Sequence, residues 1–195
     1  MKPLFILLTV LSAFTCFSQE KPAGTKMYNK DFKWTITIPA GFDTVSAEKW
    51  DQMQNRGNDV LEKTYGTRFE NLAKPIFVFR SDKYNYFESN YQPFDIKKDG
   101  DYLESFYNVN EVMYGTFEDQ MKGAKLDSSY STTTISGLLF HVYKIKITLP
   151  NNMSLTWYSY GRLFGKKDLT VNILTVDEQK EKELLDSWLN STFAK

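Results

Sequence analysis

The chain has 195 residues and no formal net charge at pH 7, because 24 Lys and Arg balance 24 Asp and Glu. This balance gives no general attraction to polyanions, and we expect no nucleic-acid partner. A single histidine and a single cysteine exclude multi-histidine and multi-cysteine zinc sites, and we expect no metal and no cofactor. Aromatic residues reach 16% of the chain, which directs the search for a binding surface to them.

The N-terminal residues predict a secretory signal peptide. A lysine precedes the apolar run 3–14, and the small residues Cys16 and Ser18 follow it before the cleavage point. The run is shorter than the ~20 residues that a transmembrane helix needs, and no second such run follows. Cleavage after Ser18 would leave a mature, exported chain beginning at Gln19, periplasmic or secreted. The alternative is a lipoprotein modified on Cys16, which the bulky Phe14 disfavours.

The remainder of the chain predicts a single domain. Residues 19–195 contain no internal repeat, low-complexity tract or long linker. A chain of this size can bury roughly 70% of its unfolded surface, so one core is sufficient without disulfides. We therefore expect a signal peptide at 1–18 and one globular domain at 19–195.

The first half of this domain predicts a hairpin, a helix and two strands. Alternation of apolar and polar residues places the hairpin strands at 27–29 and 32–39. A helix is predicted from Ser46, a suitable N-cap, to about Tyr65. Two further segments, listed in chain order, predict a buried strand and a looser, aromatic-rich strand or loop: 75–80 and 85–93.

The second half predicts a helix, a long antiparallel meander and a closing helix. Helical spacing of apolar residues covers 101–121, with Asp99 or Asp101 as the N-cap and Gly123 at the end. Period-two alternation predicts three strands in series at 138–149, 154–164 and 168–176. The Ser/Thr/Tyr-rich segment 126–135 has strand propensity and turns at Ser136-Gly137 into this meander. The closing helix begins after Thr175, which has capping-box spacing to Glu178, and it ends near Asn190. Leu184, Leu185, Trp188 and Leu189 share one face of that helix.

Three of these features together resemble the PsbP-like superfamily. They are the opening strand Phe32–Phe42 with its Pro-Ala-Gly-Phe turn, the meander Gly137–Val176, and the closing helix Glu178–Leu189 with the tail Ser191-Thr-Phe193. The superfamily includes PsbP of photosystem II, Mog-type Ran release factors and exported bacterial proteins such as DcrB. The segment Glu48–Phe94 also resembles exported proteins of the Bacteroidota.

The resemblance implies an α+β fold, in which an antiparallel β-sheet is flanked by helices as an α/β/α sandwich. It implies no catalytic residues, because the superfamily has no common active site. The single histidine, His141, lies in mid-strand beside apolar neighbours, and we interpret it as packed between sheet and helix. The acidic pairs Glu118-Asp119, Asp99 with Asp101 and Asp177-Glu178 lie at helix ends or on helix surfaces, where carboxylates are expected for solvation.

The best candidate for a binding surface is a set of aromatic side chains joined by one arginine. Tyrosine and arginine are enriched at recognition surfaces because they bury a large area at low entropic cost. The members of the set are Tyr84, Tyr86, Phe87, Tyr91, Phe94, Tyr158, Tyr160 and Arg162. The competing interpretation is that helices cover both faces of the sheet and these rings belong to the core.

The sequence therefore predicts an exported, non-catalytic binding or accessory protein of the bacterial cell envelope. Its partner would be a protein, a glycan or a lipid, and the sequence does not distinguish them. The alternative is a hydrolase-type enzyme that uses carboxylates and tyrosines without histidine or cysteine. A deep pocket with facing, desolvated carboxylates would favour the enzyme, and an exposed aromatic patch would favour the binding protein.

Overall fold

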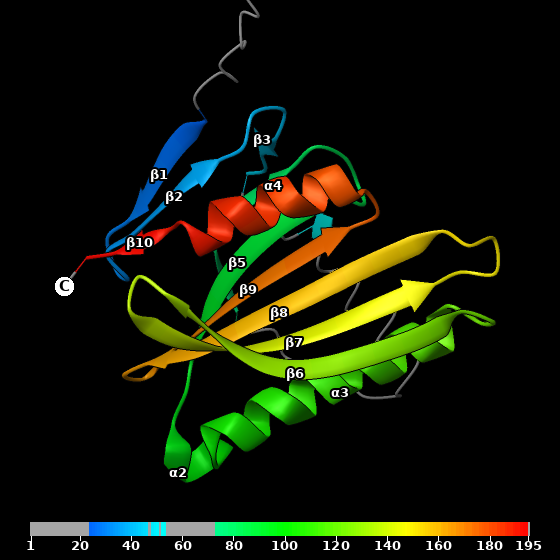
Figure 1. Cartoon of the computed structure of the whole chain (residues 1–195). Coiled ribbons are helices and arrows are strands. Elements are labelled where there is room, and N and C mark those ends of the chain that lie inside the picture. The colour runs from blue at the N-terminus through cyan, green and yellow to red at the C-terminus, as the bar shows by residue number, and fades with distance from the viewer. Residues whose placement is uncertain (1–23, 47, 51, 54–72, 195) are drawn as a thin grey trace, which may run out of the picture.

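The computed structural model of the 195-residue chain describes residues 24–46, 48–50, 52–53 and 73–194 (Figure 1). The predicted signal peptide at 1–18 lies outside this part of the chain. The predicted helix from Ser46 to Tyr65 also lies mostly outside it, and its described residues 48–50 and 52–53 are helical. No helix among the described residues is both long enough and apolar enough to cross a membrane.

A seven-stranded antiparallel sheet forms the centre of the molecule. In order across the sheet its strands are β3 (Asp43–Thr44), β4 (Lys74–Arg80), β5 (Tyr86–Pro93), β9 (Lys167–Thr175), β8 (Ser154–Phe164), β7 (Leu138–Thr148) and β6 (Lys125–Ile135). The predicted meander is confirmed, because the bounds of β7, β8 and β9 differ from the prediction by no more than one residue at either end. Segment 85–93 is more regular than expected, since β5 pairs with both β4 and β9.

Tight turns hold the long strands in register. Ser136 and Gly137 join β6 to β7 with φ angles of 52° and 78°. Two successive positive φ angles are what a two-residue type I′ hairpin turn requires, and that turn matches the twist of the flanking strands. Gly165 has a φ angle of 62° in the turn between β8 and β9. The eleven residues of β6 consequently pair one to one with β7.

A second, three-stranded sheet covers part of one face of the central sheet. The predicted hairpin forms its strands β1 (Thr25–Asn29) and β2 (Trp34–Ile38), and β10 (Thr192–Phe193) pairs with the other side of β2. Trp34, Ile36 and Ile38 are buried, as the alternation predicts. The start and the end of the described chain therefore meet in one small sheet.

Besides the helical residues 48–50 and 52–53, the described fold contains the helices α2 (Ile96–Asp99), α3 (Tyr102–Gln120) and α4 (Glu178–Leu189). Asp101 caps α3, because its side chain accepts a hydrogen bond from the Glu104 amide. The predicted Thr175 cap of α4 is wrong. Asp177 is the N-cap, since its carboxylate accepts from the Lys180 amide at 2.9 Å, and the Thr175 hydroxyl donates to Glu181 instead.

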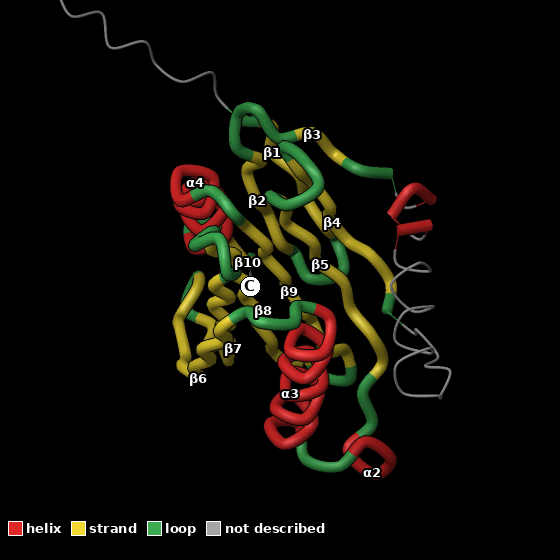
Figure 2. The backbone as a smooth tube through the Cα atoms, turned by 90° about the vertical axis from the view of Figure 1, so that its right-hand side faces the viewer, coloured by secondary structure: helices red, strands yellow, loops and turns green. Residues whose placement is uncertain are grey.

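Each face of the central sheet has a hydrophobic core of its own. On one face, Phe140, Tyr160 and Ile173 pack against α4 and the small sheet. On the other face, Tyr143, Ile145, Ile147 and Trp157 pack against Phe106 and other residues of α3. Figures 1 and 2 show α4 and α3 on opposite sides of the strands. The fold is thus α+β, with helices flanking an antiparallel sheet, as predicted.

Residue Leu189 departs from the predicted apolar face of α4. Leu184 and Trp188 are fully buried, but 43% of Leu189 is exposed. The last turn of α4 leads to β10 (Figure 1). Trp188 on this turn faces the core, whereas Leu189 faces away from it. Leu189 contributes to a cleft instead of to the core.

Candidate functional site

The structure does not bring the eight predicted binding residues together on one surface. Phe87, Phe94, Tyr158 and Tyr160 are buried, whereas Tyr84 is exposed at a loop. Tyr86 and Tyr91 are partly buried. They lie on opposite faces of β5, because successive side chains of a strand alternate between its faces and one of the two positions is even and the other odd. Arg162 is partly buried, donates to the Leu139 carbonyl at 2.6 Å and lies over the ring of Phe164.

Two members of the set, Tyr158 and Tyr160, nevertheless lie close to a cleft. Tyr158 and Tyr160 lie on the face of β8 that α4 covers, and their rings stack with centroids 6.2 Å apart. The Tyr158 hydroxyl donates a 2.6 Å hydrogen bond to Glu181 of α4. Glu181 lines a cavity of about 680 Å³ beside this contact.

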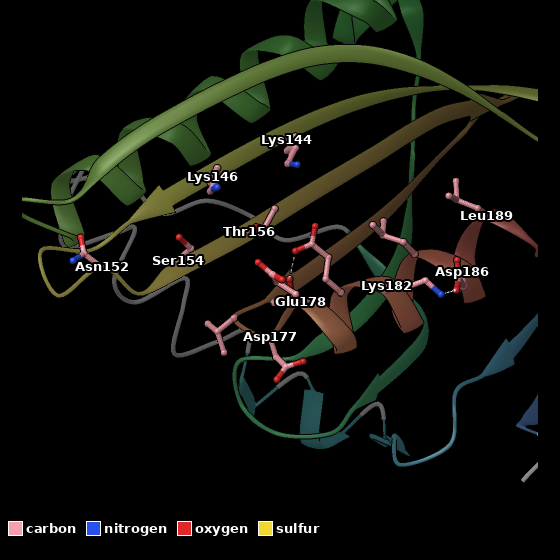
Figure 3. Close-up of a pocket in the computed structure, with 14 residues that line it drawn as sticks. Lys144, Lys146, Asn152, Ser154, Thr156, Asp177, Glu178, Lys182, Asp186 and Leu189 are labelled. Atoms are coloured by element: carbon pink, nitrogen blue, oxygen red, sulfur yellow. Dashed lines mark hydrogen bonds and ion pairs between the residues drawn. The ribbon is translucent and has the colours of Figure 1, made fainter. Parts of the chain in front are cut away.

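We call this cavity the α4 cleft. Its floor and one wall come from β7, β8, β9 and the β7–β8 turn, and its other wall is α4 (Figure 3). The residues that line it are Lys144, Lys146, Asn152, Ser154, Thr156, Thr175, Val176, Asp177, Glu178, Glu181, Lys182, Leu185, Asp186 and Leu189.

The cleft forms where the sheet face changes from apolar to polar along the strands. On β7 the side chains that point towards α4 are Phe140 and Val142 in the core, followed by Lys144 and Lys146. The neighbouring strand β8 changes in the same direction, from buried tyrosines to Thr156 and Ser154. The polar half of this face cannot be covered by an apolar helix surface, and the acidic first turns of α4 stand over it.

The two walls carry opposite charges. Lys144 and Lys146 project from β7, and Figure 3 shows them across the cleft from Glu178 and Asp186 of α4. Lys182, the cation on the α4 wall, forms an ion pair with Asp186 at 3.2 Å along the helix. The cleft is therefore complementary to a polar partner that presents both a negative and a positive group, with the negative group towards β7.

Glu181 is held in a fixed position between two hydroxyl donors. Tyr158 donates to Oε1 at 2.6 Å, and Thr175 donates to Oε2 at 3.3 Å. Burial raises the pKa of the Tyr158 phenol above its ordinary value, and the hydrogen bond to Glu181 raises it further. Tyr158 consequently stays protonated and acts as a donor, with the Lys144 ammonium 5.0 Å from its ring centroid.

His141 lies on the opposite face of the sheet from the α4 cleft. Its ring is 6.3 Å from that of Tyr102 and 6.1 Å from that of Phe106, both in α3. The interpretation that His141 packs between sheet and helix is confirmed. Beside it, Tyr102 donates to Asp168 at 2.9 Å, and burial raises the pKa of the Asp168 carboxyl.

A buried carboxyl on β5 is a second feature that the sequence did not reveal. Glu88 is 3% exposed and accepts hydrogen bonds from Asn90 and from Asn172, the latter at 2.7 Å. Burial raises the pKa of this carboxyl, and the two amide donors act in the opposite direction. Within the described residues, no group of three or more His, Cys, Asp and Glu side chains is arranged to hold a metal ion.

Sequence reasoning missed the α4 cleft because it treated the charges of α4 as a solvated surface. The signal that points to it is the pair Lys144 and Lys146, which share a strand face with core residues. Alternation alone places these two lysines on that face. It does not show that α4 leaves this part of the face uncovered. Only the position of α4 along the strands creates the cavity.

Comparison with solved structures identifies the fold. The solution structure of cyanobacterial PsbP (CyanoP) from Synechocystis sp. PCC 6803 superposes with a TM-score of 0.54 at 11% identity, covering 92% of this chain and 98% of that one. The chain has a PsbP-like fold. A crystal structure from Bacteroides thetaiotaomicron VPI-5482 aligns with a TM-score of 0.49 at 10% identity, covering 89% of this chain and 49% of that one. No family model and no curated protein matches the sequence.

The α4 cleft lies between two elements of the PsbP-like fold. The cleft lies between the closing helix and the meander, which are two of the three features that carry the sequence resemblance. At 11% identity the likeness extends to the fold, so the side chains of the cleft have to be judged by their own chemistry.

Proposed function

We propose that this chain is an exported, non-catalytic binding or accessory protein of the bacterial cell envelope, and that the α4 cleft is its binding site. The predicted signal peptide supports export, and the PsbP-like fold is consistent with an accessory role. The observation that carries the proposal is the cleft itself, about 680 Å³ in volume with a cationic wall on β7 and a largely acidic wall on α4. Clefts of this size accommodate a small ligand or a short segment of a partner.

Of the three partner classes, a protein segment fits the cleft best. The described lining contains three large apolar side chains, Val176, Leu185 and Leu189, which is little apolar surface for a lipid chain. No aromatic ring is among these lining residues, so a sugar ring finds no flat face on which to stack. Amide and hydroxyl groups from Asn152, Ser154 and Thr156, together with charges of both signs, suit a polar peptide.

A paired charge-reversal experiment tests this proposal. The variant K144E/K146E inverts the β7 wall and should lose the partner that the wild-type protein captures from an envelope extract. The control K97E/K98E makes the same change of charge on two exposed lysines of α2, at the α3 side of the molecule, and should retain it (Figure 1). Equal capture by both variants would show that the α4 cleft is not the binding site.

The hydrolase alternative predicts a different result. Its support is the group of carboxylates in the cleft, of which Glu181 is held by two hydroxyls. The raised pKa of Tyr158 argues against this tyrosine as a nucleophile, because a phenol reacts as its phenolate. Hydrolysis of a panel of ester, glycoside and peptide substrates that disappears in E181Q would overturn the binding proposal in favour of an enzyme.

A further inference from the structure

The outer edge of β6 is long and regular. Its eleven residues pair one to one with β7 without a bulge, and no other strand of the described chain pairs with it. Figure 2 shows β6 as the outermost strand on its side of the sheet, with no described element beyond it. The opposite edge of the sheet is different, because β3 is only two residues long and contains Asp43.

The turn that follows β6 determines which backbone groups face outwards. In a two-residue hairpin the residues that flank the turn, Ile135 and Leu138, form a hydrogen-bonded pair. Hydrogen bonding to β7 then alternates along the strand, so the odd-numbered residues from 125 to 135 bond to β7. The residues whose N–H and C=O groups point away from β7 are Leu126, Ser128, Tyr130, Thr132 and Thr134.

Beyond Asp127 this edge lacks the devices by which proteins prevent edge-to-edge pairing. Such devices are short strands, prolines, bulges and charged side chains along the edge. In β6 the only charged residues are Lys125 and Asp127, and the segment Ser128–Ile135 has neither charge nor proline. Residues 127–132 are all exposed. An unprotected edge of this length fits a strand that has a partner.

We propose that this partner is β6 of a second copy of the chain, paired antiparallel with Tyr130 at the two-fold axis. In this register Ser128 faces Thr132 of the other copy and Leu126 faces Thr134, so every outward-facing residue meets an outward-facing residue. All five outward N–H groups of each strand are then satisfied, which is about ten hydrogen bonds for the pair.

The charges of β6 favour antiparallel over parallel pairing, and the Tyr130-centred register is the one in which all five outward-facing residues are paired. In the antiparallel register Lys125 faces Ile135 and Asp127 faces Thr133, so no charge meets a like charge. Parallel pairing in register would place both charges beside their own copies, which is unfavourable. Tyr130 is already oriented by α3, because its hydroxyl donates to Glu111 at 3.0 Å and its ring packs on Tyr107. The pairing would join two central sheets into one and leave both α4 clefts free.

Sedimentation analysis of the mature protein tests the proposal. The wild type should have twice the molar mass of one chain at high concentration. Thr132→Pro removes one outward N–H from each copy while leaving the bonds to β7, so the dissociation constant should rise about tenfold or more. Thr132→Ala keeps that N–H and should remain dimeric. Far-UV circular dichroism establishes that both variants are folded.

A charge test is specific for the register. S128K/T132K places lysines opposite each other at two positions and should yield monomers, whereas S128K/T132E places lysine opposite glutamate and should remain dimeric. A wild-type protein that is monomeric throughout the accessible concentration range overturns the proposal. A dimer that neither T132P nor S128K/T132K affects also overturns it. A monomer whose β6 edge binds an extended envelope peptide would show that the partner is another protein and overturns it as well.

Discussion

Replacing Trp188 by alanine should remove a large part of the stability of this protein. The side chain is 0% exposed, and truncating a buried tryptophan costs about 3–5 kcal/mol. Its ring lies 5.2–6.3 Å from rings on five strands of both sheets, namely Trp34, Phe87, Phe140, Tyr160 and Phe193. Such pairs add to the free energy of burial, so we expect a loss of about 4 kcal/mol from a total of ~5–15 kcal/mol.

Chemical denaturation and thermal melting followed by circular dichroism measure this loss. For a chain of this size about 4 kcal/mol corresponds to a fall of about 8–16 °C in the melting temperature. Leu189→Ala is the control on the same helix, because Leu189 is 43% exposed and its truncation should change stability by no more than about 0.5 kcal/mol. Trp188→Phe should cost less than Trp188→Ala, since it keeps a ring and removes an indole N–H that has no partner among the described residues. A Trp188→Ala variant as stable as Leu189→Ala would refute the docking of α4 on the sheet.

Three further predictions address the other face of the sheet and the N-terminus. Gly161→Ala would place a methyl carbon 2.5 Å from the Phe106 ring, so it should destabilise the protein by about 1–3 kcal/mol in urea unfolding; unchanged stability would show that α3 does not pack closely there. Glu88 has a folded-state pKa raised by burial, so the folded state binds more protons than the unfolded state, and its contribution to stability falls as pH rises through and above the ordinary value of 4.5. The melting temperature of Glu88→Gln relative to that of the wild type should therefore be higher at pH 7 than at pH 4, and an equal difference at both pH values would contradict a raised pKa. The mature protein should begin at Gln19 without a lipid, and an intact mass that includes acyl chains would identify a lipoprotein.

The periodicity of the chain determines the long strands and helices of the described part, whereas the short elements β3, α2 and β10 were not predicted from it. The alternation in the meander places Tyr143, Ile145 and Ile147 on one face and the two lysines of β7 on the other, and the structure has this arrangement. Capping residues and turn glycines fix the ends of α3 and the β6–β7 hairpin for local reasons, since their hydrogen bonds and φ angles involve near neighbours.

Features that depend on residues distant in the sequence were decided by the tertiary structure. Half of the aromatic set that predicted a binding surface is buried, because the sheet sends alternate rings to opposite faces and packed elements cover them. The hydrogen bond from Tyr158 to Glu181 joins residues 23 positions apart, and it exists only because α4 packs on the same sheet face as Tyr158. Local patterning shows which residues are apolar on a given face, but how far a helix covers that face is set by packing across the whole core. That extent of coverage produces the α4 cleft.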